Sequence, residues 1–185
     1  MNNDLRYAGF WLRLGSLLLD SIILAPLTLL VFWASGHHRL FEVYYLIPGT
    51  FFGLFYSVFL VRRFGGTPGK LIMGIRIRKV GGDDIGYREA FLRYLPEAGL
   101  VLLMSIVMAF SLFQMTDAEY KALGFIERYE RLVELGPWWF KPLQLVQIIW
   151  VWGELIVLLT NRRRRALHDF IAGTVVVQLK EWKMA

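Results

Sequence analysis

Four long apolar segments dominate this sequence and decide what the chain can fold into. They span residues 10–33, 41–61, 90–113 and 138–160. A helix that crosses the roughly 30 Å hydrocarbon core of a bilayer needs about 20 mostly apolar residues, and each segment meets that requirement. The hydrophobic fraction of 56% also exceeds what a soluble domain of this length needs. We therefore expect residues 1–185 to form a single membrane domain, an all-α bundle of four transmembrane helices.

Lysine and arginine are divided unequally between the two sides that four spans create. Most of them lie in the link 62–89 and in the segment 161–185, whereas the loops 34–40 and 114–137 carry fewer. Because basic loops tend to stay in the cytoplasm, we expect both termini there, with the protein in a bacterial cytoplasmic (inner) membrane. The arginine run 162–165 is expected to contact anionic lipid headgroups.

Two segments predicted to be cytoplasmic have the pattern of strands. In "LIMGIRIRKVGGDDIG", Ile75 and Ile77 alternate with arginine before a turn, and "AGTVVVQLKEW" near the C-terminus is rich in β-branched residues. Both lie on the same side of the membrane, so pairing would satisfy their backbone groups. We predict a small two-stranded β ribbon. The competing interpretation is a re-entrant helix over 167–179.

The loop 114–137 is predicted to hold a short helix. Acidic and basic residues recur in it at helical spacing, and it ends in Gly136 and Pro137. This pattern indicates an amphipathic helix that lies near the outer membrane surface.

Several classes of function find no support. His37 and His38 are adjacent on an outer loop and His168 is on the opposite side, so no metal site is expected. There is no cysteine, and no nucleophile has a plausibly placed base, so we do not expect an enzyme or a cofactor. The net charge of +6 is distributed between apolar segments instead of forming a patch, so no nucleic acid partner is expected.

The stretch "GGTPGKL" resembles a phosphate-binding loop only superficially. Three residues separate Gly65 from Gly69, where that motif has four, and Leu71 follows Lys70 where a serine or threonine is required. We therefore predict no nucleotide partner and interpret the stretch as a tight turn.

Arg13 and Asp20 are ionisable residues inside the first apolar segment. They lie on one helix face about 10 Å apart along the axis, which is too far for an ion pair. Arg13 could extend to the headgroups, but a carboxylate as deep as Asp20 must be protonated, paired or in a wet cavity. Ser16, one turn earlier, could add an oxygen ligand. Asp20 and Ser16 are therefore candidate ion- or proton-binding residues.

The third and fourth segments carry further ionisable residues. Arg93 and Glu97 are four positions apart on one helix, so we predict a local ion pair between them rather than a transport role. Glu154 is the only acid of the fourth segment and is a second candidate for a buried proton or cation carrier.

Together these features resemble the RDD family of small integral membrane proteins, named for one arginine and two aspartates. The matching residues are Arg13, Asp20 and Asp169, and "GGTPGKLIMGIRI" and "LHDFIAGTVVV" resemble the family's two recurrent stretches. The long outer loop is the departure from that pattern. The resemblance implies one of two roles, because some members are reported as monovalent cation/proton antiporters and many look like components of larger systems.

The first hypothesis is an ion transporter. Asp20 would alternate between a proton and a cation such as Na⁺, and an ion pair between Arg13 and Asp169 would gate access. Four spans are few for alternating access, so a homo-oligomer is expected.

The alternative is a non-catalytic structural or accessory subunit of a larger membrane assembly. In that case Arg13 and Asp169 pin the C-terminal strand against the bundle. Asp20 would then bond across helices to Glu154, Gln147 or Arg93.

Overall fold

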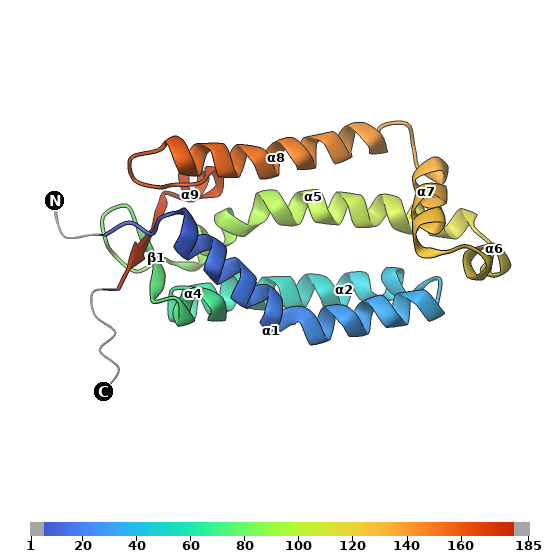
Figure 1. Cartoon of the computed structure of the whole chain (residues 1–185), viewed down its shortest axis with the longest axis horizontal. Helices are drawn as coiled ribbons and strands as arrows, with labels where there is room; N and C mark the ends of the chain where they lie inside the picture. The colour runs from blue at the N-terminus through green and yellow to red at the C-terminus, as the bar shows by residue number, and fades with distance from the viewer. Residues whose placement is uncertain (1–5, 180–185) are drawn as a thin grey trace.

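The computed structural model describes residues 6–179, which are mostly helical (Figure 1). The elements in chain order are α1 (Phe10–His37), α2 (Phe41–Leu54), a π-helical turn (Phe55–Phe59), α3 (Leu60–Phe64), α4 (Pro68–Ile72), β1 (Ile75–Lys79), α5 (Tyr87–Gln114), α6 (Asp117–Ala122), α7 (Phe125–Leu135), α8 (Phe140–Thr160), α9 (Leu167–Ala172) and β2 (Thr174–Gln178). The fold class is therefore the predicted one, a helical bundle with a small ribbon.

Four helical runs are long and apolar enough to cross a membrane. They are Phe10–His37, Phe41–Ile72, Tyr87–Gln114 and Phe140–Thr160. Each contains most or all of one predicted span. Their outward faces expose many large apolar side chains, as a surface in contact with lipid requires.

The two ends of the bundle differ. The strands and α9 lie at one end, here called the sheet end, and α6 and α7 lie at the other, here called the loop end (Figure 1). α7 runs across the long axes of the spans, as the predicted amphipathic helix should, and it buries Leu132. The buried residues at the loop end are Leu112, Met115, Tyr120 and Leu132.

The predicted ribbon is present at the sheet end. β1 and β2 pair antiparallel, with Ile75 opposite Gln178. On the other edge of β2, the amide of Ala8 donates to the carbonyl oxygen of Val176 at 2.8 Å. β2 is thus flanked on both sides, which explains why residues 174–177 are all buried. A re-entrant helix over 167–179 is therefore wrong, although its first part does form the short helix α9.

The ribbon packs onto the base of the bundle. One face of β1 inserts Ile75 and Ile77 into a buried cluster, while its arginines lie on the other face. The buried residues of this cluster are Ala8, Val58, Val61, Ile75, Ile77, Ile85, Ala90 and Val176. Residues from both halves of the chain meet here, so this cluster holds the ribbon against the bundle at the sheet end.

Candidate functional site

Two buried carboxylates lie at the sheet end of the bundle. Asp20 projects from α1 and is 8% exposed, and Asp169 projects from α9 and is 0% exposed. The two are held by different kinds of partners.

Asp20 is surrounded by neutral hydrogen-bond donors. The Tyr56 hydroxyl donates to Oδ1 at 2.6 Å, the Thr67 hydroxyl donates to Oδ2 at 2.5 Å, and the Gly69 amide donates to Oδ1 at 2.7 Å. A carboxylate offers about four lone-pair positions, so three donors nearly satisfy it. We call Asp20, Tyr56, Thr67 and Gly69 the Asp20 site.

The short helix α4 brings two of these donors to Asp20. Gly65 adopts the left-handed conformation (φ 80°) and ends α3, which lets the chain turn back. Thr67 then precedes Pro68 at the first turn of α4. At Gly69 a Cβ atom would lie 2.3 Å from the Ser16 carbonyl oxygen, so only glycine permits this contact between α4 and α1.

The partners that the sequence predicted for Asp20 are not the ones it has in the structure. Ser16 is buried but its hydroxyl donates to the Arg13 carbonyl oxygen at 2.8 Å, within its own helix. Glu154 and Arg93 join the other carboxylate, and Gln147 lines a groove of 690 Å³ bounded by α2 and α5. The physical reason is that α4, interpreted from the sequence as a turn, folds against α1 and occupies the space beside Asp20.

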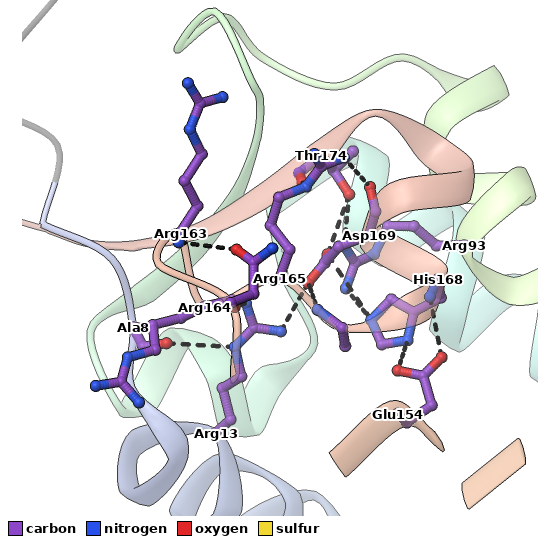
Figure 2. A network of polar contacts seen from close by, with 12 residues as sticks. Ala8, Arg13, Arg93, Glu154, Arg163, Arg164, Arg165, His168, Asp169 and Thr174 are labelled. Atoms are coloured by element: carbon purple, nitrogen blue, oxygen red, sulfur yellow. Dashed lines mark hydrogen bonds and ion pairs between the residues drawn. The ribbon is translucent and has the colours of Figure 1, made fainter. Parts of the chain in front are cut away.

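Asp169 is surrounded by positive charge (Figure 2). Arg13 Nη1 lies 2.8 Å from Oδ2, and Arg93 Nη1 contacts Oδ1. The Thr174 hydroxyl also donates to Oδ1 at 3.1 Å. The Arg13 and Asp169 pair proposed from the sequence is therefore present. We call Arg13, Arg93, Asp169, Thr174, His168 and Glu154 the Asp169 network.

Arg13 uses its guanidinium entirely within the protein. Nη2 donates to the Arg164 carbonyl oxygen at 2.5 Å and Nε donates to the Ala8 carbonyl oxygen at 3.4 Å (Figure 2). Its side chain is 12% exposed. Arg13 thus joins α1 to the segment before α9 instead of extending to lipid headgroups.

Arg93 does not form the predicted pair with Glu97. Its guanidinium points toward Asp169, also donates to the Thr174 hydroxyl at 2.7 Å, and is 9% exposed, whereas Glu97 is exposed. A buried guanidinium gains more from a buried carboxylate than from an exposed one on its own helix, because water screens the latter.

His168 connects Glu154 to the network. Arg93 Nη2 lies 2.8 Å from Nε2, and because arginine can only donate, Nε2 is the acceptor and the proton is assigned to Nδ1. Nδ1 lies 2.8 Å from Glu154 Oε2, and the His168 amide donates to Oε1 at 2.9 Å. Glu154 therefore fastens α8 to the start of α9.

The network keeps Asp169 ionised. Burial alone would raise the pKa of Asp169, but the positive charges of Arg93 and Arg13, with the Arg13 hydrogen bond, hold it well below its usual range. Asp169 is thus a permanent anion at physiological pH.

Within residues 6–179, no three histidine, aspartate or glutamate side chains gather as a metal site would require. The chemistry available at the sheet end is that of the carboxylates of Asp20, Asp169 and Glu154, hydroxyls and buried basic groups.

Sequence reasoning missed several residues of the Asp20 and Asp169 environments, Gly69 and His168 among them. Tyr56 and Thr67 are 36 and 47 positions from Asp20 in the chain, and Thr174 and Arg165 lie beside Asp169. The sequence signal for Thr67 and Gly69 was the run "GGTPGK", because its glycines and proline break the helix that follows the second apolar segment.

Comparison with known proteins agrees with this architecture. Residues 7–173 match the profile described as "RDD family". The chain is also 27% identical over 179 residues to "Uncharacterized protein YckC" of Bacillus subtilis (strain 168), a match that covers 94% of this chain and 86% of that protein.

Proposed function

This chain belongs to the RDD family, and from that premise we propose that it exchanges a monovalent cation such as Na⁺ for a proton, with Asp20 as the cation-binding carboxylate. The observation that carries the proposal is the contrast between its two buried carboxylates. Asp169 has two arginines at hydrogen-bonding distance, whereas the groups bonded to Asp20 are two hydroxyls and an amide. Within the described residues no basic side chain bonds Asp20 directly, so a mobile cation can take that place on its carboxylate.

The ligand chemistry of the Asp20 site suits a small monovalent cation. Carboxylate and hydroxyl oxygens are hard ligands, and each hydroxyl keeps lone pairs that can turn toward a cation. The site lies where a membrane helix is interrupted at Gly65, as ion sites in transporters often do. An ionisable residue in such a position is a functional candidate by default.

We also propose how the protein is oriented in the membrane and that it assembles with copies of itself. The basic residues of the sheet end favour a cytoplasmic location for it, facing anionic headgroups. Four spans are few for alternating access, which favours a homo-oligomer in the bilayer. The protein is proposed to act as a transporter and not as an enzyme.

Everted membrane vesicles test the exchange directly. Added NaCl should release protons from acidified vesicles that contain the wild-type protein, and Asp20→Asn should abolish this response, because the amide carries no charge to balance Na⁺. Asp83→Asn, the same substitution at an exposed residue, is the matched control. Protein level is measured in the same vesicles. Unchanged exchange in Asp20→Asn would contradict the proposal.

The Asp169 network favours a second candidate, a non-catalytic accessory subunit. Its residues tie α1, α5, α8 and β2 to α9, which is what a rigid platform for another membrane protein requires. In that case purified wild-type protein in liposomes shows no Na⁺/proton exchange, while Asp20→Asn lowers only its thermal stability. Exchange by the purified protein alone would exclude this candidate.

A further inference from the structure

A pocket of 390 Å³ lies at the loop end, at the opposite end of the bundle from Asp20 and Asp169. It is bounded by the ends of α1, α2 and α5 together with α6 and α7, and α7 crosses the loop end (Figure 1). Two of the lining side chains carry opposite charges, Glu42 in the first turn of α2 and Arg128 in α7. The proposed exchange uses neither of them. A volume of this size is typical of sites for small ligands.

Glu42 and Arg128 do not neutralise each other by direct contact. Among the ion pairs formed by residues 6–179, none includes either side chain. Arg128 Nη2 donates to the Leu123 carbonyl oxygen at 3.1 Å, and the guanidinium lies 3.9 Å from the centre of the Tyr120 ring. Glu42 is exposed to the pocket and is near enough to interact electrostatically with Arg128. Each charge can therefore accept an oppositely charged group of a ligand.

The wall of the pocket is held in place without a ligand. The Tyr120 hydroxyl donates to the Ser35 carbonyl oxygen at 2.6 Å, which fastens α6 to the end of α1. The rings of Phe32 and Phe125 meet edge to face with their centres 5.3 Å apart, which fastens α7 to α1. A site that is formed in advance loses less entropy when a ligand binds.

One side of the pocket is aromatic and opens toward lipid. Phe32, Trp33 and Phe125 line it, and they are 54%, 60% and 65% exposed. Large aromatic side chains at the end of a membrane helix lie at the boundary between the hydrocarbon core and the headgroups. A lipid can therefore place its headgroup in the pocket while its acyl chains remain in the bilayer.

The two charges select the chemistry of that headgroup. A free cation is attracted by Glu42 but repelled by Arg128, and a free anion meets the reverse, so a group that carries both charges fits best. A phosphate accepts charge-assisted hydrogen bonds from a guanidinium, and a primary ammonium donates them to a carboxylate. A quaternary ammonium has no N–H group to donate. The headgroup that satisfies both residues is therefore phosphoethanolamine.

We propose that this pocket binds the phosphoethanolamine headgroup of a membrane lipid, with the ammonium at Glu42 and the phosphate at Arg128. The acyl chains pass over Phe32, Trp33 and Phe125 into the bilayer. The headgroup then bridges α2 and α7, two elements whose charges do not touch in its absence. Neither the Asp20 site nor the Asp169 network takes part.

Lipid competition on the purified full-length protein tests the site. Phosphatidylethanolamine, phosphatidylcholine and phosphatidylglycerol with the same acyl chains are added at equal concentration in detergent, and native mass spectrometry measures the amount of each lipid bound. The wild type should bind the ethanolamine lipid about tenfold better than either competitor, which is the factor that one charge-assisted hydrogen bond contributes. This comparison needs no variant, so it does not depend on the folding of one.

Substitution of Glu42 shows whether the preference comes from the pocket. Glu42→Gln leaves Arg128 as the charge in the lining, so the preference should turn from phosphatidylethanolamine to anionic phosphatidylglycerol. Lipid bound to the arginines of the sheet end is common to both proteins and cancels in the comparison. Glu130→Gln, at an exposed residue of α7 outside the pocket, should behave as the wild type. Arg128→Gln should weaken the binding of all three lipids, because all three carry the phosphate.

Three results would overturn the proposal. The first is equal binding of the three lipids by the wild type. The second is an ethanolamine preference that is the same in the wild type and in Glu42→Gln. The third is binding of soluble glycerophosphoethanolamine as tight as that of the lipid, which would assign the pocket to a free solute and not to the membrane.

Discussion

Asp20 and Asp169 are both aspartates at the sheet end of the bundle, yet their surroundings differ in one decisive respect. Asp169 is bonded to two arginines, and Asp20 is bonded to two hydroxyls and one amide. Bonds to arginine fix the charge state of a carboxylate and cross-link the elements that supply them. Bonds to neutral donors hold a carboxylate in place while leaving its charge to be balanced by something else.

This difference suggests a division of labour. The Asp169 network joins four helices and a strand, so its loss should affect the whole fold. The Asp20 site joins α1 to the end of the second span, so its loss should affect a local contact and the binding of cations. Three changes with effects of different size test this division of labour.

Substitution of Asp169 should have the largest effect. Asp169→Asn leaves two buried guanidiniums, those of Arg13 and Arg93, without a charged partner, which should cost about 3–5 kcal/mol of stability. Fluorescence-detected size exclusion after heating measures the loss. Asp84→Asn removes an ion pair with Arg78 in which Asp84 is 75% exposed, so it should cost less than about 1 kcal/mol. Equal losses in the two variants would contradict the structural role of the network.

An added methyl group at Gly69 should have an intermediate effect. The Cβ atom of Gly69→Ala would lie 2.3 Å from the Ser16 carbonyl oxygen and 2.7 Å from Asp20 Cγ, so α4 must move away from α1. Overpacking of this kind costs about 1–3 kcal/mol and should also weaken Na⁺ binding. The matched control is Gly99→Ala in α5, where an added Cβ meets nothing within 4 Å. A Gly69→Ala protein with wild-type melting and Na⁺ binding would show that the close contact is not needed.

Moderate changes of pH should have the smallest effect on the Asp169 network. The pKa of Asp169 is lowered in the folded protein, so its contribution to stability is complete above the ordinary aspartate value of about 3.9. That contribution is lost only as pH falls through the lowered pKa. The difference in melting temperature between wild type and Asp169→Asn should therefore be constant from about pH 5 to pH 8 and should shrink below about pH 4. A difference that disappears near pH 6 would mean that Asp169 titrates normally.

The spans and the ribbon were predictable because their signals are local. A run of about 20 apolar residues has one stable solution in a bilayer, a helix, and alternating β-branched residues favour a strand. The pair of Arg13 and Asp169 came from the family resemblance, not from spacing. The pair of Arg93 and Glu97 was wrong because helical spacing allows a contact but does not choose between it and a better partner elsewhere.

The sequence by itself determined that this chain associates with a membrane, that four of its segments are long and apolar enough to cross one, and that Asp20 needs partners, because the transfer energies of apolar and charged groups depend little on context. Only the tertiary structure decided which partners each acid has. Thr67 and Gly69 reach Asp20 because Gly65 turns the chain back and Gly69 lets α4 touch α1, whereas Tyr56 reaches it from the π-helical turn Phe55–Phe59. A contact between residues that far apart depends on the packing of whole helices, and no local pattern encodes that packing.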